Sequence, residues 1–313
     1  MSHGPGITVT LGPCDDMRAE VFVRMAAPPG AAAARLEGTL VGPECRRATT
    51  LPATARLVDL GPPPGATAAT LVARAVLTEP AFWTPDLPNL YRLEARIVRD
   101  EGEVTTCVSR IGLRRLGARG RSFRLDGRRW VPRGVRLDAA TFDAAALRHD
   151  VATAVVMQPD EPLCGRADDE GLAVIAVVDG AAGVDDLVGR IAAWAVHPAV
   201  MLALLPPGTP AEAAGAIAAG ARGCKGTLLL GWWVDGAVPP PPVPAGIDWL
   251  AVAVGGGGEP HAAWRDAAPP VPLVACGGSG GRAGCDTLQA RLAAWLLAGD
   301  GRPPWDWAGY VVW

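Results

Sequence analysis

The hydrophobic pattern of this chain changes once, close to residue 115, and that change limits the fold more than any other feature. Before it, apolar and polar residues alternate in short runs, as in a sheet with one face in water. After it, continuous apolar runs alternate with helical segments. Because these two patterns build different cores, the sequence predicts two domains, residues 1–115 and residues 116–313.

The first part has strand-like runs separated by stretches rich in Gly and Pro. The runs are residues 7–11, 19–24, 35–41, 70–77, 91–98 and 105–111. About seven short strands of this kind favour an immunoglobulin-like β-sandwich.

The second part has eight strand candidates with helical segments between most of them. The strand candidates are residues 131–137, 153–158, 172–179, 199–205, 227–234, 247–254, 272–276 and 309–313. The helical segments are residues 143–150, 163–170, 184–196, 210–221 and 285–298. This alternation predicts a (β/α)8 TIM barrel, reduced in size because it is shorter than the usual ~250 residues.

A hairpin is expected between the two domains. Asp126-Gly127 lies between Phe123-Arg-Leu125 and Trp130-Val131. Asp-Gly favours a type I′ turn, in which both central residues have positive φ. The sequence therefore predicts a tight turn at these two residues.

Composition excludes several classes of partner. The 29 basic and 32 acidic residues give a net charge of −3, and the arginines are dispersed, so a nucleic-acid partner is not expected. No apolar run approaches the ~20 residues of a membrane span, and the N-terminus does not resemble a signal peptide. We therefore expect a cytoplasmic protein with no membrane partner.

The cysteines do not indicate a disulfide framework or a zinc ribbon. There are 7, an odd number, and they contain no Cys-x-x-Cys pair. No group of His, Asp and Glu has metal-ligand spacing. The sequence thus predicts reduced thiols, no metal site and no cofactor.

Motifs on either side of residue 115 resemble those of glycoside hydrolase family 2, the β-galactosidase, β-glucuronidase and β-mannosidase group. Phe82-Trp-Thr-Pro-Asp-Leu-Pro-Asn-Leu-Tyr91 is similar to the family's Leu-Trp-Ser-Pro-x-x-Pro-x-Leu-Tyr. Ile111-Gly-Leu-Arg114, Phe123-x-Leu-Asp-Gly-Arg128 and Arg133-Gly-Val135 follow the family's next three motifs in order and spacing. Further along, Asp168-Asp-Glu and His197-Pro-Ala-Val also resemble family motifs. The resemblance implies a sandwich followed by a catalytic barrel.

The residues that the resemblance assigns to catalysis are absent. The family is a group of retaining glycosidases, which use two carboxyl groups about 5 to 5.5 Å apart. Its acid/base glutamate corresponds to Gly208, and its nucleophile to Gly277, give or take one residue. The resemblance thus implies a non-catalytic member, a pseudoenzyme with the fold of a hydrolase.

Other carboxylates at strand ends keep an active alternative open. Asp179 and Asp235, which end the third and fifth barrel strands, are the best pair by position. Loops after strands are also rich in Asp as turn and capping residues, which is the simpler interpretation.

A sugar could also be held without being cleaved, because an aromatic ring packs against the apolar face of a pyranose. Trp233 and Trp264 are the candidate platforms at the barrel mouth, although a barrel tryptophan is more often a core residue. The polar contacts would come from acids near strand ends: Asp138, Glu161 and Glu259.

Three functions therefore stay open. The first is a non-catalytic protein of carbohydrate metabolism that binds a carbohydrate or acts as a scaffold. The second is an active O-glycosyl hydrolase with relocated carboxylates. The third is a structural or protein-binding module with a plugged barrel, whose partner would be another protein or a second copy of the chain.

Overall fold

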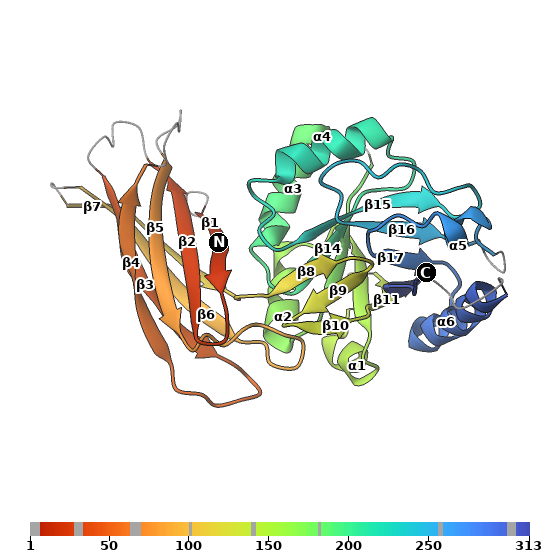
Figure 1. The fold of residues 1–313 in the computed structure, drawn as a ribbon. Coiled ribbons are helices and arrows are strands. Elements are labelled where there is room, and N and C mark those ends of the chain that lie inside the picture. Colours follow the sequence, from red (N-terminus) through yellow and green to blue (C-terminus); the bar gives the residue numbers. More distant parts are fainter. Residues whose placement is uncertain are drawn as a thin grey trace. The chain divides into compact units, whose positions relative to one another are not determined.

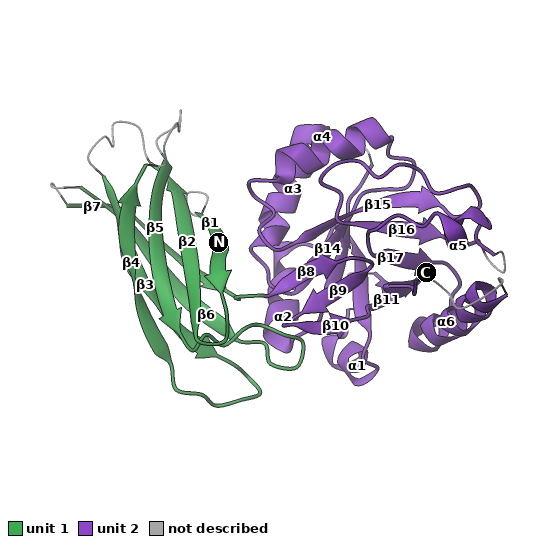
Figure 2. Ribbon diagram, viewed as in Figure 1, with its two compact units in different colours: residues 1–114 green, residues 115–313 purple. Residues whose placement is uncertain are grey.

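The computed structural model describes residues 7–27, 34–62, 70–99, 102–138, 142–180, 183–255, 259–298 and 305–313. The chain divides into two compact units, Met1–Arg114 and Arg115–Trp313 (Figure 2). Within the described ranges, no helix is both long enough and apolar enough to cross a membrane.

The first unit is an antiparallel 7-stranded sheet in the order β1-β2-β5-β4-β3-β6-β7 (Figure 1). Its strands are β1 (Ile7–Cys14), β2 (Arg18–Ala26), β3 (Arg35–Glu44), β4 (Ala53–Gly61), β5 (Thr70–Thr78), β6 (Leu90–Arg99) and β7 (Gly102–Ile111). Strands β2 and β6 are separated by three others, yet Val21, Val23 and Leu93 belong to one buried cluster. The sheet therefore curls over its own core and resembles a sandwich.

Strand β4 is the one that the sequence did not predict. Its inner face carries the buried Ala55 and Leu57. Val58 and Leu60 on the same strand are exposed, at 57% and 49%. Apolar residues on both faces remove the alternation by which such a strand is recognised.

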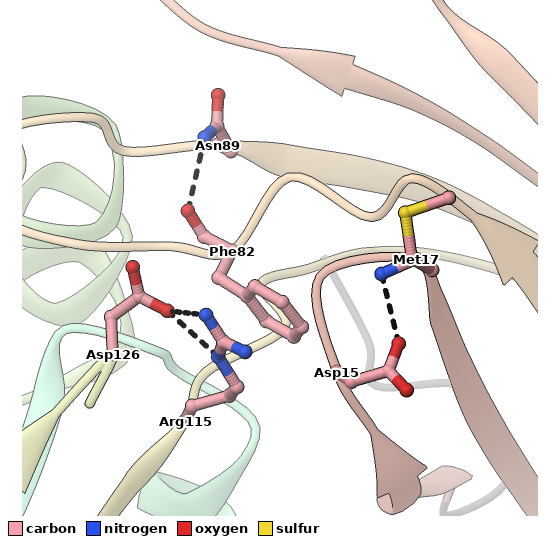
Figure 3. Close-up of polar contacts among 6 residues, drawn as sticks. All are labelled: Asp15, Met17, Phe82, Asn89, Arg115 and Asp126. Atoms are coloured by element: carbon pink, nitrogen blue, oxygen red, sulfur yellow. Dashed lines mark hydrogen bonds and ion pairs between the residues drawn. The ribbon is translucent and has the colours of Figure 1, made fainter.

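The segment between β5 and β6 contains the Trp-x-Pro motif and is tied down by its own polar groups. The Ala81 amide donates to the Tyr91 hydroxyl at 2.8 Å. Asn89 Nδ2 donates to the Phe82 carbonyl at 3.0 Å (Figure 3). In the turn before β2, the Met17 amide donates to Asp15 Oδ1 at 2.8 Å (Figure 3). Trp83 is fully buried, so this motif is part of the core of the unit.

The second unit begins with a small sheet in the order β10-β9-β8, made of β8 (Leu116–Arg119), β9 (Ser122–Leu125) and β10 (Arg128–Trp130). Leu125 pairs with Arg128, and Asp126 and Gly127 have φ of 49° and 75°. The predicted type I′ turn is thus confirmed. Asp126 also forms an ion pair with Arg115 at the start of the unit (Figure 3).

The rest of the unit is a closed barrel of parallel strands in sequence order (Figure 1). The strands are β11 (Arg133–Leu137), β12 (Thr153–Met157), β13 (Val174–Val177), β14 (Val200–Leu204), β15 (Leu229–Asp235), β16 (Trp249–Ala253), β17 (Leu273–Cys276) and β18 (Gly309–Val312). Seven of the eight predicted runs contain one whole strand, and the fifth, residues 227–234, ends one residue before β15 does.

The helices of the barrel are few and mostly short. They are α1 (Ala144–His149), α2 (Glu161–Glu170), α3 (Val184–Ala195), α4 (Ala211–Ala221), α5 (Ala263–Asp266) and α6 (Gly281–Leu297). In the described part of the chain, no helix lies between β15 and β16. The barrel is therefore closed, but the strand–helix alternation is incomplete.

The β8–β10 sheet packs against the amino ends of barrel strands. Phe123 on β9 is fully buried, and its ring meets that of Trp249 at the start of β16 with centroids 6.1 Å apart. Arg121 donates to the Ala268 and Pro269 carbonyls before β17 at 2.6 Å and 2.9 Å. Arg129 donates to Asp306 before β18 at 2.6 Å. This sheet covers one end of the barrel, and the carboxyl ends of the strands form the other.

Candidate functional site at the carboxyl ends of the barrel strands

The strand register determines which side chains face the barrel interior. Residues paired in register share a face, and so do residues two apart on one strand. Pairing runs from Trp233 to Ala251, from Ala251 to Val274, and from Val274 to Gly309 on β18. Trp313 lies four residues beyond Gly309 and therefore shares the face of Trp233.

Trp233 and Trp313 meet across the barrel rather than along its wall. Strands β16 and β17 lie between β15 and β18, so the path along the wall is about 14 Å at the usual strand spacing. The ring centroids are only 5.2 Å apart, with an interplanar angle of 45°. The two rings thus cross the opening at the carboxyl ends of β15 to β18, and both are partly exposed.

Arg136 completes this group from the neighbouring strand. Gly134 pairs with Val311, so Arg136 and Trp313, two residues further on each strand, share the interior face. The Arg136 guanidinium carbon lies 5.6 Å from the Trp313 ring centroid, within the range of a cation–π contact. We call Arg136, Trp233 and Trp313 the mouth cluster.

Gly277, the position that the resemblance assigns to the nucleophile, has no room for a side chain. A Cβ built on Gly277 would lie 2.0 Å from the Val254 carbonyl oxygen. Real Cβ atoms do not approach backbone oxygen so closely, because the overlap is strongly repulsive. The chain after β17 therefore runs too near the end of β16 to present a carboxylate from this position.

Gly208, the position that the resemblance assigns to the acid/base residue, differs from Gly277. No atom lies within 4 Å of a Cβ built there, and the residue is exposed. Its φ is +81°, however, a conformation that glycine adopts far more easily than glutamate does. The loop after β14 thus has a backbone conformation at residue 208 that favours glycine.

The two alternative acids are not adjacent in the barrel. Asp179 follows β13 and Asp235 ends β15, with β14 between their strands, and both side chains are exposed. Asp235 Oδ1 accepts a hydrogen bond from the Ala237 amide at 2.9 Å, so its carboxylate caps a turn. This is the behaviour expected of an ordinary loop acid.

The other predicted contacts are spread around the mouth. Asp138 follows β11, Glu161 begins α2, and Glu259 precedes α5; all three are exposed. Among the described residues, no group of three His, Cys, Asp or Glu side chains could hold a metal ion.

Trp264 is not a surface residue, and the expectation of a sugar platform there is wrong. It lies in α5, its ring is fully buried, and its Nε1 donates to the Val238 carbonyl at 2.8 Å. The Trp264 side chain thus packs in the core and joins α5 to the loop after β15. Of the two predicted platforms, only Trp233 keeps an exposed surface.

Cys276 ends β17, beside Gly277, and is unsuited to act as a nucleophile. It is 2% exposed, and its burial raises the pKa of its thiol well above the usual range. A buried thiol of this kind stays protonated at neutral pH and therefore unreactive.

A buried polar contact of the barrel unit lies away from the mouth. Asp168 on α2 accepts from the Ala199 amide at 2.8 Å, and its other oxygen lies 2.7 Å from His197 Nδ1. These residues come from two of the motifs quoted above, Asp168-Asp-Glu and His197-Pro-Ala-Val. Both motifs thus serve one contact that fastens α2 to the entry of β14.

Sequence reasoning missed Arg136 and Trp313. Neither belongs to a motif. Their place in the mouth cluster is recognised only from the contact of the Arg136 guanidinium with the Trp313 ring and from that of the Trp313 ring with Trp233. The signal that could have identified them is the alternation along β11 and β18, which places each of them two residues beyond a buried interior residue.

Comparisons with known proteins agree with this architecture. Residues 19–114 match the model of the glycosyl hydrolases family 2. No curated protein matches the chain.

Among solved structures, a glycosyl hydrolase family 2 member from Bacteroides cellulosilyticus has a TM-score of 0.68 at 16% identity, over 98% of this chain and 45% of its own. A Bifidobacterium dentium β-glucuronidase complexed with coumarin-3-O-glucuronide has a TM-score of 0.63 at 13% identity, over 98% and 59%. A Bacteroides uniformis β-glucuronidase has a TM-score of 0.63 at 14% identity, over 98% and 45%. The chain thus spans about half the length of these proteins. The resemblance to family 2 is confirmed, by the family model over the first unit and by fold over both units.

Proposed function

We propose, from this resemblance to glycosyl hydrolases family 2, that the chain is a non-hydrolytic carbohydrate-binding protein. In this proposal the first unit is an immunoglobulin-like sandwich, and the second is a reduced (β/α)8 barrel. The carbohydrate is bound at the carboxyl ends of the barrel strands, where ligands of such barrels are usually found.

One observation carries the proposal. The Trp233 and Trp313 rings contact each other at the carboxyl ends of the strands, and the Trp313 amide donates to the Gly278 carbonyl at 3.2 Å, next to the position assigned to the nucleophile. An exposed indole face packs well against the apolar face of a sugar ring.

Arg136 supplies the polar part of the proposed site. Its guanidinium group has several donors in a fixed plane, and contact with the Trp313 ring restricts that plane. A sugar stacked on the tryptophans could accept hydrogen bonds from those donors through its hydroxyl groups. Binding would therefore need both the rings and the guanidinium.

Calorimetric titration with mono- and oligosaccharides tests this function. We expect saturable binding that is lost in Trp233→Ala and weakened in Arg136→Ala. Trp130→Ala is the control, because Trp130 is also partly exposed but lies on β10, at the amino ends of the strands. Thermal unfolding of each variant verifies that the barrel is intact.

A second function is supported by the same rings. Because the Trp233 and Trp313 rings are in contact, the protein's own side chains also fill the barrel opening between their strands. If no sugar produces heat or a thermal shift with the folded protein, the binding proposal fails and a structural or protein-binding module is favoured.

A further inference from the structure

The connection between β15 and β16 contains an unusual run of prolines in place of a helix. Residues 238–244 read Val-Pro-Pro-Pro-Pro-Val-Pro. All of them lie in the described part of the chain and outside any helix or strand.

The sequence of this run determines its conformation. Each proline fixes its own φ near −65° and lacks an N–H group. Each residue that precedes a proline is also pushed out of the helical region toward extended geometry. Consecutive prolines therefore adopt a polyproline II helix, which has 3 residues per turn.

Exposure along the run is uneven. Val238, Pro239 and Pro242 are exposed, whereas Pro240, Pro241, Val243 and Pro244 are more buried. One edge of the polyproline helix is thus turned toward solvent, and Pro239 and Pro242 stand one turn apart on it.

The two ends of the run are anchored to the barrel unit. The Val238 carbonyl accepts from Trp264 Nε1 at 2.8 Å, and the Pro244 carbonyl accepts from the Ile247 amide at 3.2 Å. Pro244 also packs over α4, since a Cβ built on Gly215 would lie 3.6 Å from Pro244 Cβ. The exposed edge is therefore held in one conformation before any partner arrives.

The exposed edge offers ring surface and free acceptors without charge. In the described parts of the chain, the carbonyls of residues 239–243 accept no hydrogen bond. The flanking acids are engaged elsewhere: Asp235 accepts from the Ala237 amide at 2.9 Å, and Asp248 accepts from the Leu230 amide at 2.7 Å and pairs with Lys225.

We infer that Pro239 and Pro242 form a docking edge for a protein with an aromatic-lined groove of the kind that binds Pro-x-x-Pro segments. Such grooves pack aromatic rings between successive prolines, and their Trp and Tyr side chains donate hydrogen bonds to carbonyls of the ligand. A fixed polyproline helix loses little conformational entropy on binding. Because the edge carries no charge, the groove that fits it needs no charged rim.

The test uses the full chain and isolated ¹⁵N-labelled SH3, WW and EVH1 domains as probes. We expect the chain to shift the amide resonances of at least one domain at its aromatic groove, in a saturable manner. Pro239→Ala combined with Pro242→Ala should weaken this binding about tenfold, as expected when two contact residues are truncated.

The matched control combines Pro240→Ala with Pro241→Ala, which changes the same number of prolines on the more buried edge. This control should weaken binding by much less than the first pair, while thermal unfolding shows that both variants are folded. The inference is overturned if no probe domain responds at about 1 mM chain, the range of very weak binding. It is equally overturned if the two pairs of substitutions have the same effect. Sugar binding plays no part in this readout, so it stands apart from the proposed function.

Discussion

At the scale of single residues, Gly277 decides what the end of β17 can do. The close approach of the Val254 carbonyl oxygen means that the fold requires glycine at position 277. The resemblance to family 2 would place a carboxylate at this position. Restoring a glutamate by mutation would therefore meet the backbone of β16 before it could reach a substrate.

Replacing Gly277 with Ala should lower the free energy of unfolding by about 3 kcal/mol, because the added methyl group overlaps a backbone oxygen that cannot move freely. Gly189→Ala is the matched control: Gly189 lies within α3, nothing lies within 4 Å of its added Cβ, and it is exposed. There we expect a gain of about 0.5–1 kcal/mol from better helix propensity. Urea unfolding measures both, and equal effects would contradict the clash at Gly277.

Cys276 gives a second test at this scale. Because burial raises the pKa of its thiol, iodoacetamide at pH 8 should leave Cys276 unmodified in the folded protein and modify it in urea. Cys45, which is partly exposed, should react without denaturant. Peptide mass spectrometry separates the two sites. Modification of both at the same rate would mean that the end of β17 is open.

At the scale of elements, the contact between α2 and the entry of β14 is the clearest structural device. Asp168 satisfies the Ala199 amide and His197 Nδ1 at once, in a buried position. The two motifs thus belong to the junction between α2 and β14, and their Asp168–His197 contact lies outside the mouth.

Asp168→Ala should destabilise the protein by about 2–3 kcal/mol, because a buried amide and a histidine nitrogen lose their partner. Asp185→Ala, in the first turn of α3, removes an exposed acid and should cost about 0.5 kcal/mol through the helix dipole alone. Urea unfolding compares the two. A cost below that of Asp185→Ala would show that the Asp168 contact is not maintained in solution.

The elements also show what the sequence could and could not predict. Most barrel strands were recognised because they are continuous apolar runs, whereas β4 was missed because Val58 and Leu60 on it are apolar and exposed. Helix α6 begins at Gly281, earlier than the predicted residue 285. Its first turn contains Gly284, where a Cβ would lie 2.2 Å from the Ser279 carbonyl oxygen, so packing rather than helix propensity selects glycine there.

The mouth could be predicted only in part, for a reason of geometry. Strand ends located Trp233 and the loop acids, because the carboxyl ends of parallel strands gather at one end of a barrel. The contact of Trp233 with Trp313 depends on the closure and register of the barrel, and the burial of Trp264 depends on how the loop after β15 packs. Neither the contact of the two rings nor the burial of Trp264 can be predicted from the residues next to them in the sequence.

At the scale of the whole molecule, the chain is similar in fold to a solved glycosyl hydrolase family 2 structure over both units. The residues that fix the fold, such as Trp83, Asp126-Gly127 and Asp168, are each engaged in the contacts described above. The two positions that the resemblance assigns to catalysis are glycines, and the Trp233–Trp313 pair lies at the same end of the barrel.

The most direct test of the proposed loss of hydrolysis is an assay of the purified chain with aryl β-galactosides, β-glucuronides, β-mannosides and β-glucosides. The assay is run beside Asp179→Asn and Asp235→Asn, which remove the two alternative acids without changing side-chain size. We predict no release of the aryl group above the buffer rate for any of the three proteins. Release that persists through repurification and disappears in either variant would contradict the account and show an active hydrolase with relocated carboxylates.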